Sequence, residues 1–215
     1  MRKALSGKEE ELGLQILKRK SRRHHPISMT DTDFADDIAL ISEKISQAQE
    51  MLNRVETETR KIGLFLNEKK TETMQFNQEI DTSLIGKNGG VIKTVDNFKY
   101  LGGWMHSSSK DFEIRKALAW TSCHKLRKIW KSKLNRKLKV KLFLSTVESV
   151  LLYGSETWTV NKTFQKRLDG CYTRMLRMAL NISWKEKLTN QQLYGELPPV
   201  SSRVAYRRML LEVIV

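Results

Sequence analysis

The chain has 215 residues, of which 40% are hydrophobic and 29% are charged, and its net charge is +15. This length and composition are those of an ordinary soluble protein with one or two domains and a sizeable core. No secretory signal and no membrane span are expected, because residues 1–13 have no apolar stretch and no apolar run is long enough to cross a bilayer.

The first predicted elements are a basic N-terminal segment and a β-hairpin. Residues 1–25 carry an excess of five positive charges, and they either lie along a phosphate backbone or are disordered. Residues 27–42, ISMTDTDFADDIALIS, are predicted to form a strand, a tight turn at Asp36 and Asp37, and a second strand.

A helix is predicted next, over residues 45–62, because apolar residues recur there at three- and four-residue spacing. Ser42 is expected to cap its start. Gly63 is expected to end it, as glycines commonly do after the last turn.

Short strands are predicted between this helix and residue 105. The sequence LFLN, residues 64–67, indicates a short buried strand, and TETMQF, residues 71–76, a half-buried one. The Asn88-Gly89 pair predicts a hairpin turn. Residues 98–105, FKYLGGWM, indicate a further strand that breaks at Gly102-Gly103.

From Ser108 onward the pattern is helical, with Ser108 and Asp111 predicted to cap the first helix. Helices are expected from there toward Trp130, over residues 138–152, from a cap at Asn161 to about residue 180, and from about residue 203. The chain ends on an apolar stretch, which is expected of a truncated domain. The predicted class is α+β, a small antiparallel sheet with one packed helix followed by a basic helical bundle, with a boundary near residues 106–110.

Charge is distributed unevenly along the chain. Residues 26–114 have a net charge of −5, whereas residues 115–141 hold eleven Lys and Arg and no Asp or Glu. Such a basic segment indicates a polyanionic partner, with nucleic acid the first choice; the alternative is a solubilising helix face. The two cysteines, Cys123 and Cys171, make no disulfide framework, so an intracellular location in the cytoplasm or nucleus is expected.

Asp36 and Asp37 allow two interpretations. Adjacent strand residues point to opposite faces, but at a turn both carboxylates can face one cleft, where two-metal phosphoryl transfer needs clustered carboxylates. Magnesium requires only one or two protein carboxylates beside substrate phosphates. The alternative is an Asp-Asp turn without a ligand, because aspartate is a common turn residue.

The residues around this pair resemble a known family. FADD followed by IALIS is similar to the catalytic hairpin of reverse transcriptases, specifically those of non-LTR (LINE-type) retrotransposons. GLFLNEKKTETM (63–74), FKYLGGWM (98–105) and ESVLLYGSETWTV (148–160) resemble the next block, the primer-grip hairpin and the thumb region of that family, and KRKSRRHHPISMTDTDFADD resembles the approach to the hairpin. Four blocks in the family's order make a more specific match than any one of them.

The resemblance assigns roles to the residues of these blocks. Asp36 and Asp37 would be catalytic carboxylates that bind Mg²⁺, with Phe34 packing beneath them. Lys70 would act near the phosphates of the incoming nucleotide; the alternative is a surface lysine. Three residues would correspond to the primer grip and support the primer strand: Tyr100, Leu101 and Gly102. The alternative is that they form a packed hairpin without this role.

The basic helices take the place of the family's thumb. These helices would contact the phosphates of an RNA template with its DNA primer, or of the RNA–DNA duplex. They would not recognise the base sequence. Trp120 and Trp130 either stack on bases or belong to the core, and the burial tendency of tryptophan favours the core. The predicted contacts are Lys125, Arg127, Lys128, Lys131, Lys133, Arg136, Lys137, Lys139 and Lys141.

The expected domains are therefore a basic segment (1–25), a partial palm (26–108), a thumb-like region (109–181) and a truncated post-thumb region (182–215). The family's third carboxylate, carried on a strand far upstream, has no counterpart, because Asp31 and Asp33 share the strand of Asp36. We expect weak magnesium binding and a fragment or decayed copy that is inactive alone, whose partner would be the missing polymerase portion in trans. The alternatives are a non-catalytic nucleic-acid-binding module and a pseudogene product without activity.

Overall fold

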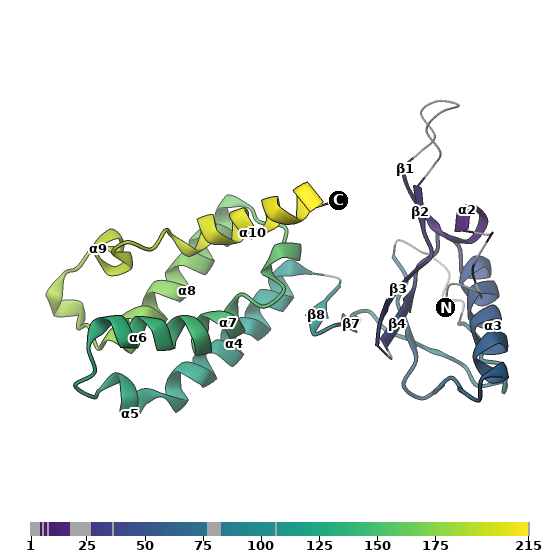
Figure 1. Ribbon diagram of the computed structural model, residues 1–215, viewed down its shortest axis with the longest axis horizontal. Helices are drawn as coiled ribbons and strands as arrows, with labels where there is room; N and C mark the ends of the chain where they lie inside the picture. The colour runs from purple at the N-terminus through teal and green to yellow at the C-terminus, as the bar shows by residue number, and fades with distance from the viewer. Residues whose placement is uncertain are drawn as a thin grey trace. The chain divides into compact units, whose positions relative to one another are not determined.

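The computed structural model describes residues 5, 7, 9–17, 27–35, 37–76, 83–105 and 107–214 (Figure 1). The chain folds into two compact units, residues 1–101 and residues 102–215. Short strands with one long helix precede a run of helices, an order compatible with the predicted α+β class.

Unit 1 contains short paired strands and the helices α2 (Glu9–Leu12) and α3 (Ile45–Lys61). The strand–turn–strand predicted around Asp36 and Asp37 is confirmed, because β3 (Asp31–Phe34) pairs antiparallel with β4 (Asp37–Leu40). An antiparallel pair precedes it, β1 (Leu14–Leu17) with β2 (Ile27–Met29), although no strand was predicted in the basic N-terminal segment. Residues 18–26, most of that basic stretch, lie outside the described residues. The remaining elements are the parallel pair of β5 (Glu72–Thr73) with β6 (Lys93–Thr94), and β7 (Lys99–Tyr100).

Helix α3 confirms the predicted amphipathic helix and carries the core of unit 1. Its apolar face buries Met51, Leu52 and Val55 against residues of the strands and loops. The predicted cap is wrong: the N-cap is Lys44, whose backbone N–H donates to Gln47 Oε1 at 2.9 Å. Gly63 follows the helix with a φ of 78°, a conformation that favours glycine, as predicted.

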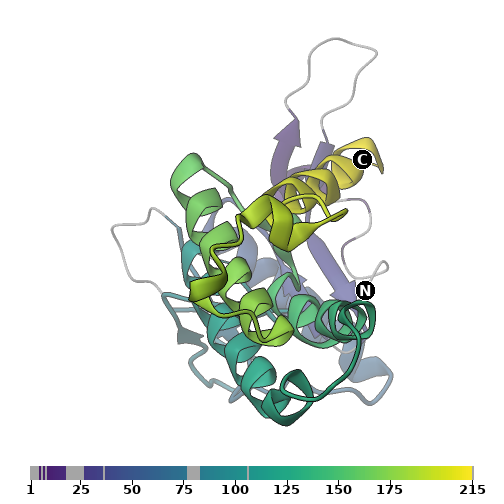
Figure 2. The same ribbon diagram turned by 90° about the vertical axis from the view of Figure 1, so that its left-hand side faces the viewer.

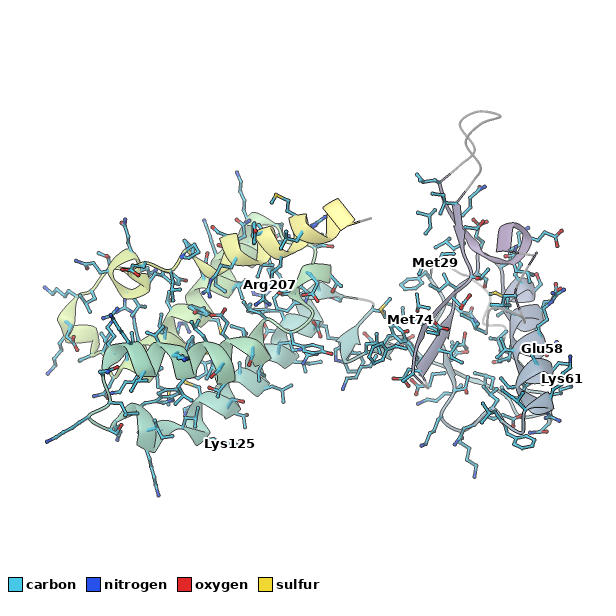
Figure 3. All side chains as sticks on the ribbon, in the orientation of Figure 1. Met29, Glu58, Lys61, Met74, Lys125 and Arg207 are labelled. Carbon is cyan, nitrogen blue, oxygen red and sulfur yellow. The ribbon has the colours of Figure 1, made fainter. Side chains whose placement is uncertain are left out.

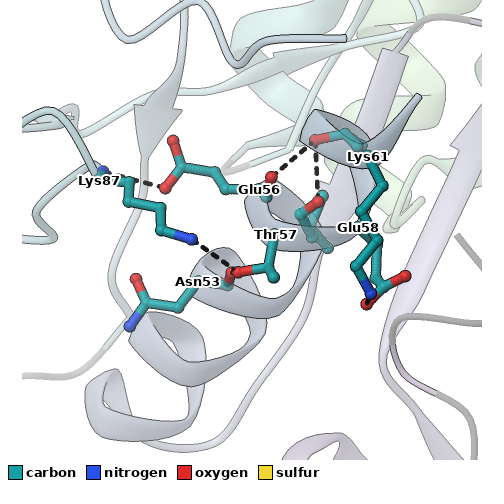
Figure 4. A network of polar contacts seen from close by, with 8 residues as sticks. Asn53, Glu56, Thr57, Glu58, Lys61 and Lys87 are labelled. Atoms are coloured by element: carbon teal, nitrogen blue, oxygen red, sulfur yellow. Dashed lines mark hydrogen bonds and ion pairs between the residues drawn. The ribbon is translucent and has the colours of Figure 1, made fainter. Parts of the chain in front are cut away.

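Side chains of α3 hold the segment of residues 83–92 in place (Figure 4). Gln49 bonds both backbone groups of Ile85, at 2.7 and 2.8 Å, and the buried carboxylate of Glu56 accepts the backbone N–H of Lys87 at 3.0 Å. The predicted turn at Asn88-Gly89 is confirmed, because Ile85 and Val91 bridge antiparallel across it. Helix α3 therefore fixes a loop that has almost no strand pairing of its own.

The buried strand predicted for residues 64–67 is wrong. These residues form an extended loop without strand pairing, and Leu64 and Phe65 are 59% and 74% exposed. A four-residue apolar run does not specify what covers it. Within the described residues, Leu66 alone of its apolar residues packs against a core cluster, that of Leu52, Leu84 and Ile92.

Unit 2 is a helical bundle in which α4, α6 and α8 lie side by side (Figures 1 and 2). Helices α7 and α10 complete the packing around them, and none of the helices within the described ranges is long and apolar enough to cross a membrane. Its elements are β8 (Gly103–Trp104), α4 (Ser108–Lys125), α5 (Arg127–Trp130), α6 (Arg136–Phe143), a π-helical segment (Leu144–Glu148), α7 (Ser149–Leu151), α8 (Lys162–Leu180), α9 (Asn190–Tyr194), α10 (Val200–Ile214), and 3₁₀ turns at Ser155–Thr157 and Trp184–Glu186.

At two helix starts of unit 2 the predicted N-cap residue can be compared with the observed one. Asn161 caps α8 as predicted, since its side chain accepts the Phe164 N–H at 2.8 Å. The cap of α4 is Ser107 rather than Ser108. Asp111 is buried instead of capping, and it accepts the indole N–H of Trp158 at 2.8 Å.

The buried Cys123 thiol gives the bundle a testable pH dependence. Burial raises its pKa from 9.0 to about 11, although a hydrogen bond involving Trp130 opposes the shift. The folded state therefore holds this proton more tightly than the unfolded state, so the associated stability is present below pH 9 and is lost as pH rises toward 11. We expect urea unfolding to show a decline of about 2 kcal/mol across this window. Cys123→Ala should reduce that decline without abolishing it, because burial also raises the pKa of Cys171. An unchanged decline in the variant would contradict the assignment.

Candidate functional site

The predicted catalytic hairpin turns directly after Phe34. Phe34 pairs with Asp37, and Ala35, which follows Phe34, has a φ of 57°. Asp37 is exposed at the first position of β4. Asp36 itself lies outside the described residues, so its predicted role remains a prediction.

The hairpin register separates its acidic side chains. Side chains alternate between the two faces of a strand, and directly paired residues share a face. Asp37 therefore shares a face with its partner Phe34, whereas Asp33, paired with Ile38, lies on the other face. Asp31 lies on the same face as Asp33, and its carboxylate accepts the Thr30 hydroxyl at 2.6 Å.

This separation bears directly on magnesium. Asp31 and Asp33 do not complete a carboxylate set with Asp37, and within the described ranges no three His, Cys, Asp or Glu side chains are grouped to hold a metal ion. The described residues of the hairpin therefore do not form a complete magnesium site. Binding through Asp36 and Asp37 remains a prediction from the resemblance.

Phe34 does not pack beneath the aspartates as the resemblance implied. Its side chain is 65% exposed, and Ile38 on the opposite face is 41% exposed. Apolar side chains are thus open to solvent on both faces of the hairpin, so burial within the described chain does not fix this element.

Lys70 lies in a turn after α3, and its side chain is exposed. The turn is held by backbone bonds, since the N–H groups of Lys70 and Thr71 both donate to Asn67 O, at 3.0 and 2.9 Å. The neighbouring Lys69 is exposed as well, and the role of Lys70 near nucleotide phosphates stays a prediction from the resemblance.

The predicted primer-grip residues form a tight turn. Leu101 and Gly102 have φ values of 47° and 83°. A Cβ at Gly102 would approach the Tyr153 ring to 3.3 Å, and its carbonyl accepts a hydrogen bond from Arg115, so glycine is required there by both backbone and space.

Tyr100 links this turn to the hairpin of the two aspartates. Its hydroxyl donates to the Thr32 carbonyl of β3 at 3.2 Å. Thr32 and Tyr100 are 68 positions apart, so this contact is the point at which the fold brings two predicted site elements together.

Most of the nine predicted nucleic-acid-binding cations are free at the surface of unit 2. Within the described part of the chain, seven of them are exposed and have neither a hydrogen-bond nor an ion-pair partner at their charged groups, and Lys125 is placed at the end of α4 (Figure 3). Unpaired exposed cations keep their full charge for a polyanion. These seven, called the basic set below, are Lys125, Arg127, Lys128, Lys131, Lys133, Lys137 and Lys141.

The other two cations hold the bundle together. Lys139 is only 7% exposed, and its ammonium donates to the Trp130 carbonyl at 2.6 Å. Arg136 donates to the carbonyls of Gln192 and Leu193 in α9, at 3.3 and 3.0 Å. Lys139 therefore does not fit the expected role of a phosphate contact. The aliphatic part of its side chain lies in the core, and its ammonium group is bonded to a carbonyl at the end of a helix.

The two tryptophans differ. Trp130 is 1% exposed and donates its indole N–H to the Cys123 carbonyl at 2.8 Å, which confirms a core role. Trp120 is half-buried, packs against the same core and stacks on His124 with ring centroids 5.6 Å apart.

Sequence reasoning missed a second group of cations on α4 and α8. Lys116, Lys166, Arg167 and Arg174 line one cavity together with Trp120. The seven- and eight-residue spacings of Arg167 and Lys166 to Arg174 were the available signal on α8, which lies outside the basic segment of residues 115–141.

Comparison with known proteins shows what these elements are similar to. Residues 12–105 match the family model of reverse transcriptase (RNA-dependent DNA polymerase). The matched residues include the Asp36-Asp37 hairpin, Lys70 and the turn at Leu101-Gly102.

A transposon-derived protein of Caenorhabditis elegans is 29% identical over 184 residues, which are 82% of this chain and 65% of that protein. The chain therefore spans just under two thirds of the length of this relative. No solved structure matches the chain. Together the two sequence matches support the predicted resemblance to a reverse transcriptase of transposon origin.

Proposed function

We propose that this chain provides part of the reverse transcriptase of a non-LTR (LINE-type) retrotransposon. The observation that carries the proposal is the family match over residues 12–105, because it spans the FADD hairpin and the two blocks after it. In this proposal residues 26–108 are palm, residues 109–181 are a thumb-like region, and residues 1–25 and 182–215 flank them.

The thumb-like region would bind the RNA–DNA duplex through the basic set. Residues 115–141 contain no acidic side chain, and the seven exposed cations have no partner among the described residues that would compete with phosphate. Contacts of this kind position a duplex without reading its sequence. Lys139 and Arg136 are left out of this interface because they bond helix ends.

The chain alone is proposed to lack polymerase activity. Two-metal transfer needs clustered carboxylates, and the register places Asp31 and Asp33 on the face opposite Asp37. Asp36 and Asp37 without a third carboxylate would bind magnesium weakly. A non-catalytic nucleic-acid-binding module is the second candidate, and the unpaired basic set is the observation that favours it.

Binding and extension assays on the purified chain test both candidates. Six or seven phosphate contacts predict a slope of log affinity against log salt of about −5 to −6, or on the order of 10³-fold between about 50 and 200 mM salt. We expect this for an RNA–DNA duplex, with Asp36→Asn binding equally well. A flat salt dependence would overturn both candidates. Primer extension on an RNA template that requires Asp36 would overturn the proposed inactivity.

A further inference from the structure

Helices α4 and α8 enclose a cavity of about 420 Å³ on unit 2. Its α4 wall consists of Phe112, Lys116 and Trp120, which are four residues apart and so share one helix face. Its α8 wall follows a similar stripe from Thr163 to Arg174. This volume is in the range of small-molecule sites.

The charge around the cavity is strongly positive. Four cations line it, and the nearby carboxylate is Glu113, which bonds both Lys116 and Arg167. The hydrogen bond from Lys116 lowers the pKa of Glu113; burial opposes this shift, and Arg167 adds to it. Within the described residues, Lys166 and Arg174 have no hydrogen-bond or ion-pair partner, so two cations remain available to an anion.

Aromatic rings and a glycine shape the remainder of the cavity. Lys116 and Arg167 already lie over the Phe112 ring, with centroid distances of 5.7 and 5.6 Å, which leaves Trp120 as the half-buried aromatic wall. Gly170 lies in the middle of α8, where a Cβ would meet no atom within 4 Å. Glycine inside a helix costs about 1 kcal/mol relative to alanine, and here its missing side chain leaves the cavity open.

We propose that this cavity binds one unpaired nucleotide, with its phosphate between Lys166 and Arg174 and its base against Trp120. Two cations of one helix, unpartnered among the described residues, and an aromatic wall match a group that is both anionic and planar. A base inside a duplex is stacked and does not reach a wall of this kind. The nucleotide is either free or part of a single strand, and the site does not depend on the polymerase assignment.

Filling the cavity without changing its charge tests the proposal. Gly170→Leu should weaken binding of a short single-stranded RNA by about 5- to 100-fold, the value of one base stack. Gly170→Ala is the matched control and should bind like the parent chain. Because neither substitution alters charge, the duplex salt slope should stay unchanged, which separates this result from that of the basic set. Equal binding of the RNA by the Leu and Ala variants would overturn the proposal.

A second pair of variants covers the case in which the leucine variant fails to fold. Lys166→Gln with Arg174→Gln should weaken binding of the same RNA about 10-fold more than Lys185→Gln with Lys187→Gln, which removes two exposed cations that do not line the cavity. Competition then identifies the source: displacement by AMP indicates a free nucleotide, and displacement only by RNA indicates a strand. Inorganic phosphate that competes as well as AMP would overturn the proposal, because the aromatic wall would then contribute nothing.

Discussion

Replacing Glu148 with alanine is expected to lower the free energy of unfolding by about 3 kcal/mol, because it leaves the largely buried guanidinium of Arg203 without its counter-ion. Glu148 ends the π-helical segment and is 7% exposed. Arg203 of α10 donates from Nη1 to both of its carboxylate oxygens at 2.6 Å. The measurement is urea or thermal unfolding of the full chain.

The surroundings of this pair explain why the loss should be large. Tyr172 donates its hydroxyl to Glu148 Oε2 at 2.6 Å, and burial followed by the charge of Glu148 raises the pKa of Tyr172. Arg203 lies 5.0 Å from the Tyr172 ring centroid, and its Nε and Nη2 are buried without hydrogen-bond partners. Neutralisation of the guanidinium therefore depends on Glu148, and the pair joins α8, α10 and the π-helical segment.

Two further variants separate the buried charge from a general effect of losing a glutamate. Glu156→Ala removes a half-buried glutamate at the nearby 3₁₀ turn and should change stability by less than about 0.5 kcal/mol. Glu148→Leu with Arg203→Met removes both charges and should recover at least half of the loss. A loss below about 1 kcal/mol for Glu148→Ala alone would contradict the role given to the pair.

The sequence correctly predicted those elements that are determined by residues close together in the chain. Helix α3 follows from its apolar spacing, its end from Gly63, and the cap of α8 from Asn161. The start of α4 was one residue off, because consecutive serines offer the same capping chemistry and only the fold selects Ser107.

Elements whose causes lie far away in sequence were not predictable. The exposure of Leu64 and Phe65 depends on what covers them, which a short apolar run does not encode. Lys139 was expected at the surface on charge alone, yet the Trp130 carbonyl at a helix end accepts its ammonium inside the core. The position of a long lysine side chain depends on which group accepts its ammonium, and the spacing of residues in the sequence does not show where that acceptor lies.

The candidate site was predictable in part for the same reason. The turn after Phe34 follows from its own residues, and the structure begins β4 at Asp37. The hydrogen bond from Tyr100 to Thr32 and the cavity between α4 and α8 both depend on tertiary packing. The sequence therefore located the hairpin but gave no sign of what lies next to it.

Neutralising three members of the basic set is expected to weaken binding of the RNA–DNA duplex on the order of 10²-fold at about 0.1 M salt. The variant is Lys128→Gln, Lys131→Gln and Lys133→Gln, whose side chains are exposed in or just after α5. Each lost phosphate contact removes the release of about 0.9 counterion, so the slope of log affinity against log salt should become shallower by about 2–3.

The matched control removes the same charge elsewhere on unit 2. Lys162→Gln, Lys185→Gln and Lys187→Gln are also exposed and lie outside residues 115–141. If local phosphate contacts drive binding, the control should retain the parent slope and most of the affinity. Equal losses in the two variants would mean that net charge alone attracts the duplex, and the basic set would then be a solubilising helix face rather than an interface. Fluorescence anisotropy across a salt series measures both variants, and unfolding curves confirm that both remain folded.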